Sequence, residues 1–353
     1  MGFRIEKITL VDALVESLDS VRAKLLSVTL RFQFLRALYA QTHYRLAVAM
    51  LISTIFYLPI AFFRPDLLLA FGPLLFGYPH LVASYRFTSL SKKYTLFAGV
   101  TLIAIALHLI DPGMTPFGVW QMVVATLTFL IAGLFSKSMT LNKATSAIVL
   151  CAAMIALAWR EPIMYVGGIL IVHNWVAFVY WYRASKTKAR KRTVIISSAL
   201  FLLIHFIVLA GMLDHWIPSE FIGNTQTTAW YLASWTPNKT VWYQMLVLYT
   251  FGLSIHYFVW LKAIPESKSP FEHPNSIRVV FKNLKNELGR KALLITALIA
   301  LAGVIIWLLS SQLGNRIYFE IAILHGALEL IYLAEALQLS TKQDHAIGDL
   351  EAS

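Results

Sequence analysis

Ile323-Leu324-His325-Gly326-Ala327-Leu328-Glu329-Leu330 is an apolar run that contains one histidine and one glutamate. The two ionisable residues are four positions apart, so on a helix their side chains lie on one face, one turn apart. Ionisable groups inside a membrane span are costly, and they usually face the interior of the helix bundle and serve a function there. The run therefore predicts a transmembrane helix that presents His325 and Glu329 to a shared site. Gly326 allows another group to approach this helix closely.

The composition of the whole chain is that of a polytopic membrane protein. Of the 353 residues, 58% are hydrophobic and 14% are charged, and the mean hydropathy is +0.66. These values exclude an ordinary soluble domain. The single cysteine, Cys151, excludes a disulfide framework and any metal cluster built on cysteines.

Hydropathy along the chain predicts an all-α membrane bundle of about ten transmembrane helices over residues 44–338. Residues 1–43 are too charged to span, and Val11, Leu14, Val15, Leu18 and Val21 recur there at helical spacing. We expect this segment to form an amphipathic helix at the cytoplasmic membrane interface, with a partner-binding helix as the alternative. Residues 339–353 are expected to form a polar cytoplasmic tail. The predicted spans are 44–63, 66–87, 94–110, 116–135, 144–159, 162–182, 194–213, 240–261, 291–311 and 316–338.

The positions of the basic residues predict how the bundle is oriented. With the N-terminus in the cytoplasm, 26 of the 30 lysines and arginines lie in the inner segments or near the inner ends of the spans, and 4 lie in the outer loops or at the outer end of a span. This split obeys the positive-inside rule and supports cytoplasmic N- and C-termini. It also accounts for the net charge of +12 without a nucleic-acid partner, and the basic segments are expected to contact membrane lipids. We therefore expect a multi-pass protein of the bacterial inner (cytoplasmic) membrane.

Three other predicted spans each carry a histidine at comparable depth, namely His80, His173 and His256. All four histidine-bearing spans run from the outside inward, and at about 1.5 Å per residue the four depths differ by about 10 Å, which helix tilt can remove. A single intramembrane histidine is often only an interhelical hydrogen-bonding group. Four of them at one depth, one with a glutamate beside it, predict a shared metal site. Imidazole ligation without sulfur suits iron, copper or zinc.

Other residues near these histidines are candidates for supporting roles. Ligating histidines need a partner for the second ring nitrogen, and Glu329 is predicted either to orient His325 or to bind the metal, which makes it the catalytic candidate. No two histidines are three or four residues apart, so HExxH and the clustered histidine boxes of membrane desaturases are excluded. Walker A and GxSxG sequences are absent as well. The candidates for hydrogen bonding to a ligand or for substrate contact are Tyr78, Ser84, Asn174, His205, Tyr257 and Trp260.

These segments resemble the Brp/Blh family, the bacteriorhodopsin-related proteins that cleave beta-carotene to retinal. Gly77-Tyr78-Pro79-His80 is similar to the opening half of that family's Gly-Leu-Pro-His-Gly-Ala-Leu-Asp segment, and His325-Gly326-Ala327-Leu328-Glu329 is similar to its second half, on a different helix. His256-Tyr257-Phe258-Val259-Trp260 resembles a later segment of the family, and His173 falls where a middle histidine is expected. The chain departs from the family at Gly252, where the family has a further histidine, and at Ser84, where it has an acidic residue.

The resemblance implies an iron(II) centre held by His80, His173, His256 and His325, which activates dioxygen against a lipid-soluble substrate. On this basis we expect a dioxygenase-like membrane oxygenase that acts on a carotenoid or another long apolar lipid. Iron(II) is the expected metal, with copper or zinc as alternatives. Two readings from other classes stay open. One is a haem b electron carrier with paired axial histidines, and the other is a metal-free transporter or receptor in which the histidines and Glu329 relay protons or bind a ligand.

Overall fold

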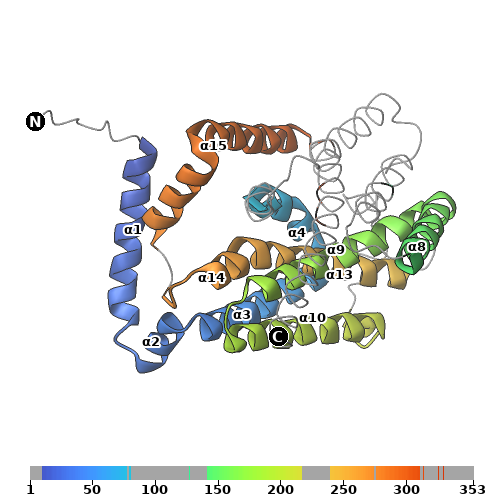
Figure 1. Cartoon of the computed structure of the whole chain (residues 1–353), viewed down its shortest axis with the longest axis horizontal. Helices are drawn as coiled ribbons and strands as arrows, with labels where there is room; N and C mark the ends of the chain where they lie inside the picture. Colours follow the sequence, from blue (N-terminus) through green and yellow to red (C-terminus); the bar gives the residue numbers. More distant parts are fainter. Residues whose placement is uncertain are drawn as a thin grey trace, which may run out of the picture.

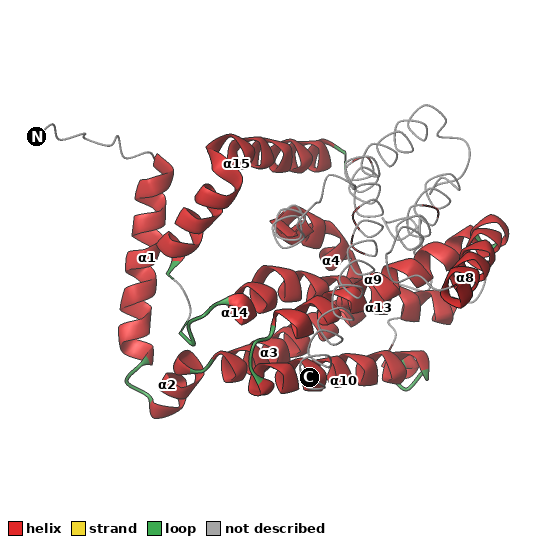
Figure 2. Cartoon of the chain, viewed as in Figure 1, coloured by secondary structure: helices red, strands yellow, loops and turns green. Residues whose placement is uncertain are grey.

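The computed structural model describes residues 10–77, 79–80, 127, 141–216, 239–273, 276–310, 313, 325 and 329. The described residues form helices joined by short connections and include no strand, as the all-α prediction expects (Figure 2). In chain order the elements are α1 (Leu10–Thr29), α2 (Gln33–Ala40), α3 (Thr42–Phe63), α4 (Pro65–Gly72), the π-helix η1 (Pro73–Gly77), α8 (Leu141–Arg160), α9 (Pro162–Ala184), α10 (Lys188–Leu209), the 3-10 helix η2 (Asp214–Trp216), α13 (Lys239–Phe258), the π-helix η3 (Val259–Ala263), α14 (Ile264–Lys268) and α15 (Ile277–Leu309).

Four helical stretches in the described part of the chain are long and apolar enough to cross a membrane: Thr42–Phe63, Lys188–Leu209, Tyr243–Lys268 and Gly289–Leu309. Their most apolar windows have mean hydropathies between 1.3 and 2.8, which indicates a membrane protein. α8 and α9 follow the predicted spans 144–159 and 162–182. The predicted spans 94–110, 116–135 and 316–338 lie outside the described residues except at Leu127, His325 and Glu329, so the total of ten spans stays a prediction.

α13 is the helix around which the described bundle is packed (Figure 1). In the most apolar part of the Tyr243–Lys268 stretch, 83% of the residues are buried. The corresponding shares are 28% for α3, 39% for α10 and 0% for the second part of α15. α13 packs against α3, α9, α10 and α4. A helix that is covered on all sides must satisfy its own polar groups, and the hydroxyls of Thr250 and Ser254 donate to backbone carbonyls one turn earlier. Most side chains on α13 are therefore buried among the surrounding helices.

A polar network around Glu272 closes one end of the bundle. The Glu272 carboxylate accepts a hydrogen bond from the Thr42 backbone N–H at 2.9 Å and pairs with Arg190 at 2.7 Å. Arg190 is buried and also donates to the carbonyls of Ser267 and Ser269. The start of α3, the start of α10 and the segment after α13 therefore meet, as the topology requires of segments that lie on one side of the membrane.

The opposite end of the bundle is held by different contacts. The Tyr243 hydroxyl donates to the Phe62 carbonyl, and the Gln244 amide donates to Asp214 at 2.8 Å. These residues lie at the end of α3, after α10 and at the start of α13, all of which are predicted to face outside. These contacts show which segments meet at each end of the bundle, and the topology across the membrane stays a prediction.

The N-terminal segment contains two helices, α1 and α2, rather than the single amphipathic helix that was predicted for residues 1–43. α1 packs against the first part of α15.

The stretch 262–291 lies between two predicted spans and was expected to be an inner loop. It contains α14 and the beginning of α15, in which apolar and basic residues recur at helical spacing. α15 bends at Gly289, where φ is +78°. Glycine adopts this conformation readily because it has no Cβ, and the apolar part of the helix begins there.

The Glu272 network predicts an acid limit to stability. Partial burial raises the pKa of the Glu272 carboxyl, but the hydrogen bonds from Thr42 and Arg190 outweigh it, so this pKa lies below its ordinary value of 4.5. A carboxyl whose pKa is lowered in the folded state stabilises the protein above its unfolded-state pKa, and this stabilisation is lost as the pH falls through the folded-state pKa. We expect the thermal unfolding temperature in detergent to fall as the pH drops below about 4.5.

Glu272→Gln should lower the unfolding temperature at neutral pH and flatten this decline. Glu161→Gln is the matched control, because Glu161 is exposed at the start of α9, and it should keep the wild-type profile. Equal pH profiles for the wild type and Glu272→Gln would contradict the assignment.

Candidate metal centre

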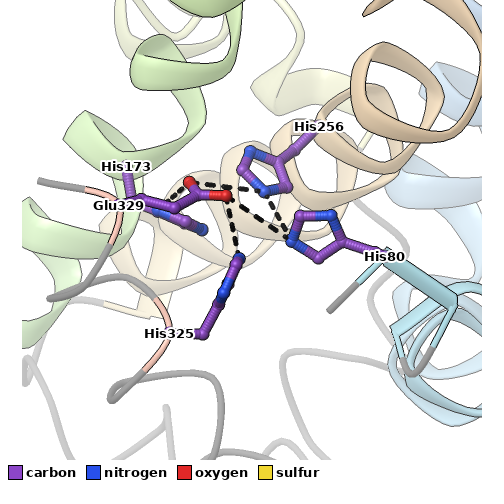
Figure 3. Close-up of side chains that lie close together, drawn as sticks. All are labelled: His80, His173, His256, His325 and Glu329. Atoms are coloured by element: carbon purple, nitrogen blue, oxygen red, sulfur yellow. Dashed lines mark hydrogen bonds and ion pairs between the residues drawn. The ribbon is translucent and has the colours of Figure 1, made fainter. Parts of the chain in front are cut away.

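Four histidines from separate parts of the chain converge in the interior of the bundle (Figure 3). His256 belongs to α13, His173 to α9, and His80 to the helical residues just beyond η1, while His325 is a helical residue near the C-terminus. All four are buried, and one ligand atom from each of them and from Glu329 lies within 4.8 Å of all the others. The similar depths inferred from the sequence therefore correspond to one site.

Glu329 is the residue that all four imidazoles share. Its Oε1 lies 2.9 Å from His325 Nε2 and 3.9 Å from His80 Nε2. Its Oε2 lies 3.0 Å from His173 Nδ1 and 4.0 Å from His256 Nε2. The side chain is 1% exposed, and burying a carboxylate is costly unless donors or a cation surround it. The sequence predicts a local pair between Glu329 and His325, and the structure places Glu329 at the centre of the whole group.

The distances within the group match those between ligands of one metal ion. With metal–ligand bonds of about 2.1 Å, ligands at right angles are about 3.0 Å apart and opposite ligands are about 4.2 Å apart. His80 Nε2 and His256 Nε2 are 3.0 Å apart, and the distances to Glu329 run from 2.9 to 4.0 Å. Neither Glu329 oxygen makes a hydrogen bond of regular geometry to a described residue. The nitrogens and oxygens instead face a common centre, so this buried group could hold a metal ion.

The chemistry of the donors limits the kind of metal without fixing its identity. Four imidazoles and one carboxylate offer nitrogen and oxygen only, which suits iron, copper or zinc rather than a site that needs thiolate. Neutral imidazoles leave the charge of a divalent cation in place, and Glu329 would neutralise half of it. Cys151 is buried on α8 and is not part of the group.

Two prolines shape the helices that carry His80 and His256. A proline inside a helix has no N–H, and its ring presses on the carbonyl four residues earlier. For Pro79 that carbonyl belongs to Leu75, and for Pro265 it belongs to Leu261. Both lie in the middle of a π-helical turn, η1 or η3, and such wide turns relieve the clash. The sequence therefore explains why both helices widen beside the histidines.

Aromatic side chains line the group on the side of His80 and His256. The Trp260 ring is 5.8 Å from that of His80 and 6.4 Å from that of His256, measured between centroids. The Tyr257 ring is 5.4 Å from that of His80. Trp260 is 0% exposed and Tyr257 is 2% exposed. These rings exclude water from the group, which strengthens electrostatic interactions within it.

Asn174 follows His173 on α9 and occupies the space beside Gly252 on α13. A Cβ on Gly252 would lie 2.5 Å from Asn174 Nδ2, closer than packed atoms allow. Asn174 is 2% exposed. Gly252 thus provides room for Asn174, the neighbour of a candidate ligand. The sequence marks Gly252 only as a departure, because a contact between two helices leaves no local pattern.

The remaining candidates divide into those that lie elsewhere and those that are not described. His205 on α10 is not part of the group, because its Nδ1 hydrogen-bonds the Phe201 carbonyl at 2.8 Å and its ring packs on Phe201 and Trp175. Tyr78 and Ser84 fall outside the described residues. Three further histidines of the described residues are also not part of the group: His43, His215 and His273.

Together the fold and the site define a helical membrane protein with a buried group of four histidines and one glutamate. No protein-family model, no curated protein and no solved structure matches the chain. The function must therefore be inferred from the site itself.

Substitution of any of the five residues should empty the site. His80→Ala, His173→Ala, His256→Ala and His325→Ala each remove a ligand, so bound metal per folded chain should fall by at least about tenfold. Glu329→Gln keeps the shape but removes the charge, and because Glu329 touches all four rings we expect a loss of about 10–100-fold in metal affinity. Metal analysis after purification gives the result. His43→Ala, His215→Ala and His273→Ala are the controls, and wild-type metal content in Glu329→Gln would show that the carboxylate is structural.

Gly252→Ala tests the contact between α9 and α13. The added methyl group would collide with Asn174, so we expect a lower unfolding temperature and less bound metal. Gly72→Ala is a matched control, because its Cβ would meet Tyr257 at an ordinary 3.7 Å. Adding Asn174→Ala to Gly252→Ala makes room for the methyl group and should restore part of the loss. Identical behaviour of Gly252→Ala and Gly72→Ala would contradict the close packing.

Proposed function

We propose that this protein is an integral-membrane non-haem iron oxygenase that acts on a carotenoid or another long apolar lipid. The observation that carries the proposal is the group of four histidines and Glu329, buried in a helical bundle whose spans are apolar enough to lie in a bilayer. The resemblance of the histidine segments to the Brp/Blh family supports the same class and points to cleavage of a beta-carotene-like substrate to retinal.

The residues of the site have separate tasks in this proposal. His80, His173, His256 and His325 would hold iron(II), and bound iron would supply the activation of dioxygen. Glu329 would balance the charge of the ion and keep the imidazoles turned inward, because it lies within 4.0 Å of a nitrogen of each. Trp260 and Tyr257 would exclude water from the reacting atoms. Dioxygen and long apolar lipids both concentrate in the hydrocarbon core, so the site lies where its substrates are.

A haem b carrier is the second candidate from the sequence, and the geometry disfavours it. Two axial imidazole nitrogens on opposite sides of a haem iron would be about 4 Å apart, with the porphyrin between them. The facing nitrogens of His80 and His256 are only 3.0 Å apart, closer than an axial pair. The other two histidines and Glu329 occupy the space around that pair, so a porphyrin ring would collide with ligand side chains.

A metal-free transporter or receptor is the third candidate. It would have to stabilise five ionisable groups through contacts among themselves, because all five are buried. Proton relay remains compatible with a histidine–glutamate group. Binding of a metal with a defined stoichiometry separates this candidate from the oxygenase.

The deciding experiment is metal analysis of protein purified and reconstituted anaerobically with iron(II). We expect about one iron per chain, and a value below about 0.2 iron, copper or zinc per chain would overturn the proposal. The visible spectrum of the same sample tests the haem alternative, because a Soret band would support haem.

Activity is then assayed by incubating the iron-loaded protein with beta-carotene in detergent and measuring retinal by chromatography. Retinal formation by the wild type but not by His256→Ala would support carotenoid cleavage. Bound iron without turnover of beta-carotene would keep the metal site and direct the search to other long apolar lipids.

A further inference from the structure

α1 carries a continuous apolar surface that no described part of the protein covers. Five side chains, here called the α1 stripe, recur at alternating spacings of four and three residues. At about 100° per residue, all five point within about 40° of the direction of the first. Each is between 46% and 65% exposed. The members of the α1 stripe are Leu14, Leu18, Val21, Leu25 and Val28.

The opposite face of α1 holds the acidic residues, and α15 contacts it along part of its length. Asp12, Glu16 and Asp19 point about 140–200° away from Leu14. Lys285 pairs with Asp12 at 4.0 Å, and Arg278 pairs with Glu16 at 3.7 Å. The Asp19 carboxylate accepts a hydrogen bond from the Ile277 N–H at 2.9 Å, at the start of α15. Asp19 also pairs with Arg22 of α1 itself at 3.6 Å. The negative charges of α1 are therefore turned away from the α1 stripe and engaged by α15 and by Arg22.

Basic residues border the α1 stripe on both sides. Arg22 and Lys24 lie about 80° to either side of its midline. Long basic side chains at such positions can extend their charged ends to lipid headgroups while their stems stay on apolar surface. Beyond the end of α1, Phe32 and Phe34 are 62% and 68% exposed, and Arg31 lies before them. The uncovered side of the segment is thus apolar at its centre and positive at its edges.

The direction of α1 matches that of a helix that lies in the plane of a membrane. In Figure 1, α1 runs across the direction of α3, α10 and α13 rather than along it. It packs against the part of α15 that comes before the bend at Gly289. The apolar, membrane-length part of α15 begins at that glycine. α1 therefore lies at the level where a membrane helix leaves the bilayer.

We propose that the α1 stripe docks on the anionic lipid headgroups of the membrane in which the bundle sits. This inference does not depend on the metal centre or on the proposed oxygenase activity. Apolar burial at the interface and attraction between the flanking cations and anionic lipid act together, as in interfacial amphipathic helices. A second copy of the chain fits less well, because it would bring Arg22 and Lys24 of both copies to the seam, while Asp12, Glu16 and Asp19 point away from the α1 stripe.

The test uses the full-length protein with Cys151→Ser, so that one introduced cysteine can carry an environment-sensitive fluorophore. Leu18→Cys places the label in the α1 stripe. Ala23→Cys is the matched control, because Ala23 is exposed on the same helix about 180° from Leu14. Each protein is placed in nanodiscs of phosphatidylcholine alone or with about 30% phosphatidylglycerol. Nitroxide-labelled lipid in the discs then quenches any fluorophore that enters the interface.

We expect strong quenching and a blue shift at Leu18→Cys in the anionic discs, and little of either at Ala23→Cys. A basic residue near an anionic surface contributes about fivefold to binding, so Arg22→Gln with Lys24→Gln should weaken docking by about 25-fold and reduce the quenching at position 18. Equal quenching at positions 18 and 23 in anionic discs would overturn the proposal. So would efficient disulfide cross-linking between two Leu18→Cys chains, which would identify the partner as a second copy.

Discussion

The Glu329 carboxylate is the constraint on which the arrangement of the bundle interior depends. An ionised carboxylate in an apolar interior is stable only when several donors or a cation surround it. Here the surrounding groups come from four separate places in the sequence, and each imidazole has a nitrogen within 4.0 Å of a carboxylate oxygen. The helices cannot slide or rotate independently without leaving that charge exposed to hydrocarbon. The contacts of this one carboxyl group thus connect four separate parts of the chain in the middle of the bundle.

Precise placement of these groups also requires that the helices be fixed at their ends. The Arg190–Glu272 pair and the contact between Gln244 and Asp214 lie at opposite ends of the bundle. Both involve the segments that join α10 and α13 to their neighbours. α13 runs between the two ends and carries His256 in its buried interior. The polar contacts at the two ends fix the positions of the helices along one another. The packed apolar residues between the ends hold those positions at the site.

Much of this could be predicted from the sequence, for identifiable physical reasons. Long apolar stretches locate helices such as α3 and α10, because a helix that crosses the bilayer must be apolar over most of its length. The depths of the four histidines indicate one site, since depth along a span follows directly from residue counting. His205 shows the limit of that reasoning, because depth does not say which way a helix faces, and His205 turns toward Phe201 instead.

Two further features were beyond prediction because they depend on contacts between distant segments. Gly252 has meaning only when Asn174 of another helix is known to lie against it. The helices within 262–291 were not predicted, because their high charge is typical of connections. The first part of α15 instead lies against α1, where Arg278 and Lys285 pair with acidic residues. The role of Glu329 was partly predicted, since its spacing from His325 is local and its contacts with the other histidines are not.

The widened turn at η1 has a consequence for how His80 reaches the site. A π-helical turn contains one more residue than an α-helical turn would, so every residue beyond it is rotated by about 100° relative to an uninterrupted α-helix. His80 lies three residues beyond η1, and its direction into the bundle is therefore set by that additional residue. His256 lies before η3, so the second wide turn leaves this histidine unaffected and instead orients Glu266 and Ser267 toward the basic residues at the end of the bundle. The turn at η1 thus sets the direction of a residue of the candidate metal centre, and the turn at η3 sets the direction of residues in the polar network at the end of the bundle.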